Sequence, residues 1–467
     1  MNVNNGVDSF IKDTFIMACI VNSLQEKLNK GISVIVDHRE QYVKSSSDFT
    51  RNRSMGFERM LKTILGLQGK TLDKEMHDLG ENIITASAFV QGRNKIKPEA
   101  FEDLYHDFTA SIPNQKNYKG YHILAVDGSD ISTPKNKDSI YFCKGIKKQT
   151  GGVAEFYNMA HLHAIYDVVN KIYVDAIVTP KAIVDGKSSA MDIGERAVAN
   201  RMIDRYNGPK AILTADRGYP GYNLLEHVNR NPNMEFLIRV PNRNTFKEIT
   251  ELPLADIDKV IEVTVSTKSM QHCKIYGYRH VDGPSPFGKD KKKISWDFGN
   301  EPCKIRYRVV RFKIANRGDE SDWETIVTSL TRFQFSAKDI KELYHMRWGI
   351  ENSFRELKYN VGVVNFHAKK DESVLQEIYA SLTMYNYAVA VAMSVNIPKN
   401  DARVHLYKVN FTMAIYIVLN YFRSKVKRKA TEIETEIQRY IAPVRPGRRD
   451  KRNLVAKGSV SFLYRVA

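Results

Sequence analysis

The chain has 467 residues, with 71 Lys or Arg against 53 Asp or Glu, so its formal net charge is +18. Hydrophobic residues make up 43% and charged residues 27% of the sequence. This ordinary globular usage excludes a disordered tail protein, a collagen-like fibre and a disulfide miniprotein. The length predicts about two to four domains with room for a large core, and the positive charge favours an acidic partner, most commonly nucleic acid.

Cysteine usage and hydropathy restrict the setting. The four cysteines form no Cys-x-x-Cys pair, so neither a disulfide framework nor a zinc knuckle is present and a reducing, cytosolic setting is favoured. The N-terminus shows no export signal. The uncharged stretch 378–398 is long enough to cross a bilayer, but it contains polar residues such as Ser381, Thr383 and Asn386. We therefore expect a buried core helix here and no membrane partner.

Residues 1–118 are predicted to be helical, because apolar residues recur at three- and four-residue spacing in segments such as 57–67. Basic residues are frequent between Arg51 and Lys97. Two interpretations remain open for this region: a helical DNA-binding domain, or a helical subdomain with solvated charges.

The pattern changes to α/β over residues 119–240, the first part of a predicted core. Strand patterns occupy five segments: 121–132, 160–169, 171–180, 210–216 and 234–241. Helical patterns occupy 187–206 and the segment after Asp216. Three strands followed by alternating helix and strand predict an α/β domain with a mixed sheet.

Residues 241–332 show the two-residue alternation of β-strands, for example at 261–266 and 304–309. A lysine run at 289–293 lies in a loop with Gly and Pro. We therefore expect an all-β insertion subdomain, placed before the last helix of the core.

The last part of the core is predicted at 333–372, where residues 337–358 have the pattern of one helix. A helical region follows over 373–467 and ends in basic segments at 422–429 and 445–452. A solvated tail and an additional contact with nucleic acid both remain open for these segments.

Two aspartates follow strands of the predicted sheet, Asp127 in LAVDGS and Asp216 in LTADRG. Ligands gather at strand C-termini in open α/β sheets, because side chains there leave the core and face the crevice. The alternative for either residue is a turn-starting aspartate, which is common after a strand. Asp130 is the local alternative to Asp127.

The predicted helix at 337–358 adds a third carboxylate. On a helical wheel, four polar residues fall within about 60° of one another: Tyr344, Arg347, Glu351 and Lys358. A charged face that serves only solubility is the alternative reading of this spacing.

Three carboxylates that converge at one sheet edge repel one another unless a cation neutralises them. Hard oxygen ligands favour Mg²⁺ or Mn²⁺, and two such ions about 4 Å apart support phosphodiester displacement. Arg347 and Lys358 would then bind DNA phosphates, and Tyr344 would donate a hydrogen bond to one.

The string Tyr344-x2-Arg347-x3-Glu351-x6-Lys358 resembles the signature of the insertion-sequence-four family of bacterial DDE transposases. Asp127 occupies the place of that family's first acidic residue, and the turn that begins with Asp216 occupies the place of the second. The resemblance covers residues 120–370. It implies an RNase H-like catalytic core in which Asp127, Asp216 and Glu351 hold divalent metal. It also implies cutting of a mobile element at its terminal inverted repeats and joining of the 3′-OH ends to target DNA.

The same resemblance implies finer roles. In related members the cut passes through a hairpin, and a flipped base stacks on a Trp of the β insertion. Trp323 is the best match and Trp296 the competitor, whereas Trp348 is expected to pack. Arg217 gains a role in contacting double-stranded DNA.

The terminal regions also gain roles from the resemblance. The N-terminal region would recognise the element end, and the C-terminal region would help to form a homodimer in the synaptic complex. A cytoplasmic, nucleoid-associated location in a bacterium follows from this reading. No organic cofactor is expected.

Two further function classes remain open. One is a DNA-binding protein that descends from a transposase and no longer cuts, which the intact acidic triad argues against. The other is an RNase H-like nuclease that hydrolyses DNA without joining it.

Overall fold

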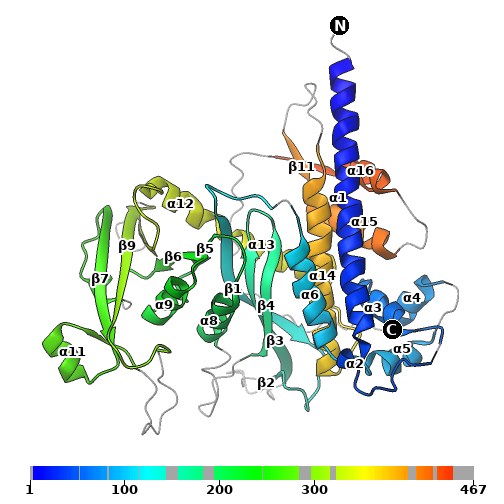
Figure 1. Cartoon of the computed structure of the whole chain (residues 1–467), viewed down its shortest axis with the longest axis horizontal. Helices are drawn as coiled ribbons and strands as arrows, with labels where there is room; N and C mark the ends of the chain where they lie inside the picture. The colour runs from blue at the N-terminus through cyan, green and yellow to red at the C-terminus, as the bar shows by residue number, and fades with distance from the viewer. Residues whose placement is uncertain are drawn as a thin grey trace, which may run out of the picture.

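The computed structural model describes eleven segments: 4–51, 53–80, 84–113, 115–143, 156–181, 194–243, 246–282, 296–315, 322–397, 406–423 and 429–444. Side chains are described from residue 19 onward. The lysine run at 289–293 and the basic segment 445–452 lie outside the described residues. A helical body stands beside a large sheet, and the long helix α1 runs lengthwise through that body, between α6 and α16 (Figure 1).

The N-terminal region is helical, as its spacing predicts. Its helices are α1 (Asn4–Asp37), α2 (Arg39–Tyr42), α3 (Phe57–Leu65), α4 (Leu72–Asp78), α5 (Ala86–Arg93) and α6 (Glu99–Ser111). Local signals fix several ends: α3 starts after Gly56, and the Thr85 side chain caps α5 by accepting a hydrogen bond from the backbone N–H of Ala88. These helices pack around α14 (Asp371–Ser394).

The central sheet begins with three antiparallel strands, β1 (His122–Thr133), β3 (Tyr157–Asp167) and β4 (Ile172–Pro180). Two strands parallel to β1 follow, β5 (Ala211–Ala215) and β6 (Met234–Val240). The helices α8 (Glu195–Arg205) and α9 (Tyr222–Arg230) flank β5 in the chain. The short β2 (Phe142–Cys143) pairs with the start of β3. The predicted mixed α/β core is therefore confirmed.

The region expected to be an all-β insertion differs in two respects. Its strands are β7 (Ile257–Ser266), β8 (Arg279–His280), β9 (Cys303–Lys313) and β10 (Trp323–Thr328), and it also contains the short helices α10 (Lys247–Thr250) and α11 (Met270–Tyr276). Strand β10 pairs antiparallel with β6, so ten strands of the described chain form one sheet. Residues 324–328 of β10 are all buried, as a strand between two neighbours requires.

The predicted single helix at 337–358 is interrupted. The chain forms α12 (Ala337–Met346), a turn at 347–348, α13 (Gly349–Glu356) and the π-helical turn η3 (Leu357–Val361). At the interruption Gly349 packs against Val168, whose side-chain carbons would lie 3.3 Å from a Cβ at this position. The turn lets the chain approach the sheet closely, and continuous helical periodicity could not reveal this.

The C-terminal region contains α14, β11 (Tyr407–Val409), α15 (Phe411–Arg423), α16 (Ala430–Arg439) and β12 (Ile441–Pro443). Helix α14 includes most of the uncharged stretch 378–398, and its apolar residues, such as Ile378, Leu382 and Val389, are 0% exposed. The prediction of a buried core helix is confirmed. None of the helices in the described segments is long and apolar enough to cross a membrane.

Helices cover both faces of the sheet (Figure 1). One apolar cluster joins α14 and the N-terminal helices to Ala125, Ala164 and Tyr173 of the first strands. The other face packs its own apolar side chains, including Leu124 and Leu213, against α8 and α9. With both faces of its central strands buried, the ends of these strands open to solvent, which places polar chemistry at that edge of the sheet.

Candidate active site

Asp127 and Asp216 lie level with each other on neighbouring strands. Strands β1 and β5 are parallel, and their register ends with the pair Ala125–Thr214. Two residues further along each chain stand Asp127, still within β1, and Asp216, directly after β5. The predicted meeting of these two aspartates at one sheet edge follows from this register, and the charge of Asp216 acts on Asp127.

Arg347 joins Glu351 to the same edge. Its Nη2 donates to Glu351 Oε1 at 3.1 Å, and its Nη1 lies 3.6 Å from Asp127 Oδ2. Arg347 is only 4% exposed. One buried guanidinium therefore contacts carboxylates from a strand and a helix that are far apart in the chain.

The charge on Asp127 is incompletely compensated. The pKa of Asp127 is raised to about 6, chiefly by burial; the nearby charges of Asp216 and Glu195 act in the same direction, whereas the hydrogen bond from Gly128 N–H and the charge of Arg347 act in the opposite direction. A carboxylate in this condition favours a proton or a nearby cation.

The turn after β5 fixes Asp216. Its Oδ1 accepts a hydrogen bond from the backbone N–H of Gly218 at 2.7 Å. A Cβ at residue 218 would lie 3.0 Å from that same oxygen, so the close approach favours glycine. The exposed Arg217 stands between these two residues.

The carboxylates fit a hard divalent cation by their chemistry, but not by their present placement. The described segments hold no group of three or more His, Cys, Asp or Glu side chains that could bind a metal ion as they stand. Arg347 contacts both Asp127 and Glu351, while its Nε is buried with no hydrogen-bond partner among the described residues. The donor set suits Mg²⁺ or Mn²⁺, and the guanidinium of Arg347 already contacts two of its three carboxylates.

Lys358, the last residue of the signature, lies beside the same strand. Its Nζ donates to Ser129 Oγ at 2.8 Å, two residues beyond Asp127. Burial lowers the pKa of Lys358. The π-helical turn η3 carries this residue, and such turns frequently occur at functional sites.

Asp130, the alternative to Asp127, is committed elsewhere. It bonds to His161 Nδ1 at 2.7 Å and to the ammonium of Lys181. Although burial acts to raise it, these two hydrogen bonds bring the pKa of Asp130 down to about 2. The geometry therefore favours Asp127 over Asp130 as the under-compensated carboxylate of the edge.

His161 and Glu195, which lie near this edge, were not predicted from the sequence as site residues. His161 lies between Asp130 and Glu195, with Nε2 3.3 Å from Glu195 Oε1, and the charge of Glu195 also reaches Asp127. Burial acts to lower the pKa of His161, but its two carboxylate partners raise it to about 9. The polar alternation of His161 and His163 in a buried strand was the available signal.

Tyr344 does not face solvent. It is 2% exposed, and its ring lies 5.8 Å from the guanidinium carbon of Arg347. The Trp348 ring lies 5.1 Å from the same guanidinium carbon. Trp348 is 36% exposed, so it is less buried than the packing role expected for it requires. In this geometry the two rings lie against Arg347, and Tyr344, for which the sequence predicts a phosphate contact, is buried.

Trp323 and Trp296 occupy different environments. Trp323 opens β10 and is partly exposed. Because β10 runs antiparallel to β6 and pairs Thr325 with Val240, Trp323 lies beyond the carboxyl end of β6, at the edge that carries Asp216. Trp296 is 1% exposed and packs edge-on against Phe298. Its burial makes Trp296 a core residue.

Comparisons with known proteins bear on this site. A family model described as a transposase DDE domain matches residues 118–387, more than half of the chain. No curated protein matches. Among solved structures, the piggyBac transposase synaptic complex with hairpin DNA is similar with a TM-score of 0.41 and 10% identity, over 94% of this chain and 87% of that one.

Proposed function

Because the chain belongs to the transposase DDE domain family, we propose that Asp127, Asp216 and Glu351 form the catalytic triad of a transposase of the insertion-sequence-four type. The chain is a DNA-cleaving transposase. In the proposed reaction it cuts a mobile element at its terminal inverted repeats and joins the 3′-OH ends to target DNA.

One observation carries this proposal. Arg347 of the signature lies 3.6 Å from Asp127 and 3.1 Å from Glu351, and Asp216 stands level with Asp127 at the end of the next strand. Two residues of the signature and the two strand aspartates thus lie at one edge of the sheet, and ligands of open α/β sheets bind at such an edge.

The proposed cofactor is Mg²⁺ or Mn²⁺, with two ions per site held by the triad. Bound ions of this kind supply activation of a water or hydroxyl and stabilisation of the leaving oxygen. The protein's own cations would orient the DNA strand: Lys358 beside Ser129, and Arg347 once it leaves the carboxylates. Arg217, exposed next to Asp216, would contact the DNA backbone.

We also propose that the core is RNase H-like. The order β4-β3-β1-β5-β6, with β3 antiparallel and β5 and β6 parallel to β1, supports this assignment. Asp216 would then stand at the carboxyl end of β5, and Asp127 on β1 just beyond the part that pairs with β5, with Glu351 of α13 joined to Asp127 through Arg347.

The remaining roles extend this proposal. Residues 1–118 would bind the element end, 119–240 and 333–372 would form the core, and 241–332 would be the insertion that supplies Trp323 to stack a flipped base at a hairpin. Residues 373–467 would support a homodimer on double-stranded DNA in a bacterial host, at the nucleoid. The charge of +18 supports a DNA partner.

Neutral, similarly shaped replacements test the triad. Asp127→Asn, Asp216→Asn and Glu351→Gln should each lower cleavage by about 10⁴-fold or more while end binding persists, since several kcal/mol of stabilisation of the reacting oxygens is lost. Glu342→Gln, on the exposed side of α12 next to Lys338, is the matched control and should cleave normally. Retained cleavage by Glu351→Gln would refute the assignment.

A strand-transfer assay separates the alternatives. Only a transposase uses a DNA 3′-OH as the nucleophile, so hydrolysis without joined product would identify a nuclease. Binding without any cut would identify an inactive descendant. Short inverted repeats beside the reading frame would support the insertion-sequence assignment.

A further inference from the structure

Arg347 is the point at which two of the three proposed metal ligands meet. Its two terminal nitrogens face different carboxylates, Glu351 at 3.1 Å and Asp127 at 3.6 Å. The residue is 4% exposed and lies against the rings of Tyr344 and Trp348. Its position is therefore fixed on several sides by the protein.

A buried cation between two carboxylates does the electrostatic work of a bound ion. Without it, the largely buried Asp127 would lose the cation that lowers its pKa and would still face the charge of Asp216, which raises it. The same contacts occupy oxygens that would otherwise coordinate a metal, and the described segments present no ready cluster of metal ligands. The guanidinium and a divalent ion thus compete for the same oxygens.

A phosphate competes for the guanidinium in turn. Arginine forms strong, charge-assisted hydrogen bonds with phosphate oxygens. The Nε of Arg347 is buried and has no partner within the described residues, so this side chain has an unused donor in its present position. A DNA phosphate at the edge offers Arg347 an anion that replaces the carboxylates.

We propose that Arg347 is a positioning residue that holds Asp127 and Glu351 in the DNA-free protein and so makes divalent-metal binding depend on DNA. This inference rests on the proposed function, because it takes Asp127 and Glu351 as metal ligands. A DNA phosphate draws Arg347 away and leaves both carboxylates to the metal. By linkage, metal strengthens DNA binding by the same factor by which DNA strengthens metal binding.

The test measures Mn²⁺ binding to the metal-free 467-residue chain by electron paramagnetic resonance. Without DNA, Arg347→Ala and Arg347→Gln should bind Mn²⁺ about tenfold more tightly than the unmodified protein, within the usual range of coupling between sites. Arg347→Lys should restore weak binding, because it keeps a cation near the carboxylates. Arg355→Ala is the matched control: this arginine is exposed on the same helix, near Asn352, and its loss should change nothing.

The unmodified protein supplies a second measurement that needs no variant. A DNA duplex whose end sequence comes from the DNA beside the gene should tighten Mn²⁺ binding by about tenfold. This increase should be smaller in Arg347→Gln, because no guanidinium occupies the carboxylates of this variant before DNA binds.

Two results would overturn the inference. One is DNA-free Mn²⁺ binding by folded Arg347→Gln no tighter than in the unmodified protein, with an unchanged melting temperature. The other is an Mn²⁺ affinity of the unmodified protein that does not change when DNA is added. Failure of the proposed function has a different signature: Glu351→Gln and Asp127→Asn would then leave Mn²⁺ binding with DNA unaltered.

Discussion

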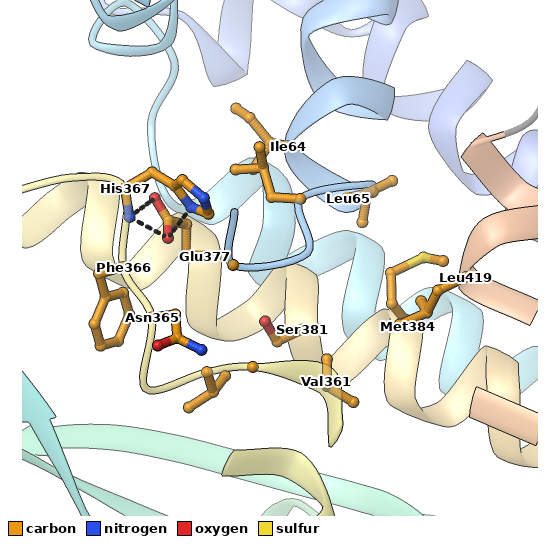
Figure 2. A pocket seen from close by; sticks show the side chains of 14 residues that line it. Ile64, Leu65, Val361, Asn365, Phe366, His367, Glu377, Ser381, Met384 and Leu419 are labelled. Atoms are coloured by element: carbon orange, nitrogen blue, oxygen red, sulfur yellow. Dashed lines mark hydrogen bonds and ion pairs between the residues drawn. The ribbon is translucent and has the colours of Figure 1, made fainter. Parts of the chain in front are cut away.

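Two charged clusters of the protein offer a direct comparison. The first, here named the catalytic edge after its proposed role, consists of Asp127, Asp216, Arg347 and Glu351. The second, the Glu377 network, consists of Arg93, His367, Gln376 and Glu377 at the junction of α5, α14 and the segment after η3. Figure 2 shows His367 and Glu377 facing each other beside a small cavity that is also lined by Ile64 and Leu65 of α3.

The Glu377 network is fully paired. Arg93 is 0% exposed and donates from Nη1 to Glu377 Oε1 at 2.6 Å, while the backbone N–H of His367 donates to Oε2 at 3.0 Å. The remaining nitrogens of Arg93 donate to Gln376 Oε1 and to the backbone oxygen of Ser373. Although burial acts to raise it, the charges of Arg93 and His367 hold the pKa of Glu377 below its usual range.

The pKa of Asp127 moves the other way, up to about 6, although Asp127 is less buried than Glu377. Burial alone therefore does not distinguish structural from functional charges. The degree of charge compensation does distinguish them. The carboxylate of Glu377 is balanced by neighbouring cations in a network that joins the N-terminal helices to α14, whereas the charge of Asp127 at the catalytic edge is incompletely balanced and favours a cationic partner.

The largest expected effect is on the Glu377 network. Arg93→Ala should lower the free energy of unfolding by about 3–5 kcal/mol, because it leaves Glu377 as an uncompensated buried charge. Chemical denaturation followed by circular dichroism measures this loss. Lys62→Ala removes only an exposed pair with Glu58 and should cost under about 1 kcal/mol. Equal losses in the two variants would break the comparison.

The two tryptophans extend the comparison to aromatic residues. Trp296→Ala should cost about 3–5 kcal/mol of stability, since it leaves a cavity in the core. Trp323→Ala should cost less stability but slow hairpin formation about tenfold or more, because stacking on a base contributes about 1–3 kcal/mol. Nicking of the first strand should be nearly unchanged. Gel analysis of the nicked and hairpin products separates the two steps, and equal loss of both would contradict the stacking role.

The smallest effect has the opposite sign. In the folded protein the pKa of Asp127 is raised to about 6, whereas its ordinary value, which applies to the unfolded chain, is 3.8. Stability is therefore lost as pH rises from about 4 through 6, and the loss persists above this range. Asp127→Asn does not titrate, so above pH 6 it should be more stable than the unmodified protein by about 1–3 kcal/mol. Below pH 4 the two should be alike.

Urea denaturation at pH 4 and pH 8 measures this difference. A variant less stable than the unmodified protein at pH 8 would show that Asp127 is compensated like Glu377. The contrast between the two clusters would then disappear.

Short-range sequence patterns determined a large part of this fold. Alternation and apolar runs located the core strands, including β1, which carries Asp127, and β5, which ends just before Asp216. Polar residues within an uncharged stretch identified α14 as a core helix. The spacing of Arg347 and Glu351 predicted that they share a face, and they do bond. Each of these features depends on neighbours within a few residues, which a periodicity records.

Only the tertiary structure determined which segments far apart in the chain contact one another. The pairing of β10 with β6, which joins the insertion to the core sheet, depends on hydrogen bonds between segments far apart in the chain. The interruption before Gly349 depends on its contact with Val168. The burial of Tyr344 and the contact of Arg347 with Asp127 also arise only on packing. A periodic pattern states which face of an element is apolar, but not which distant element covers it.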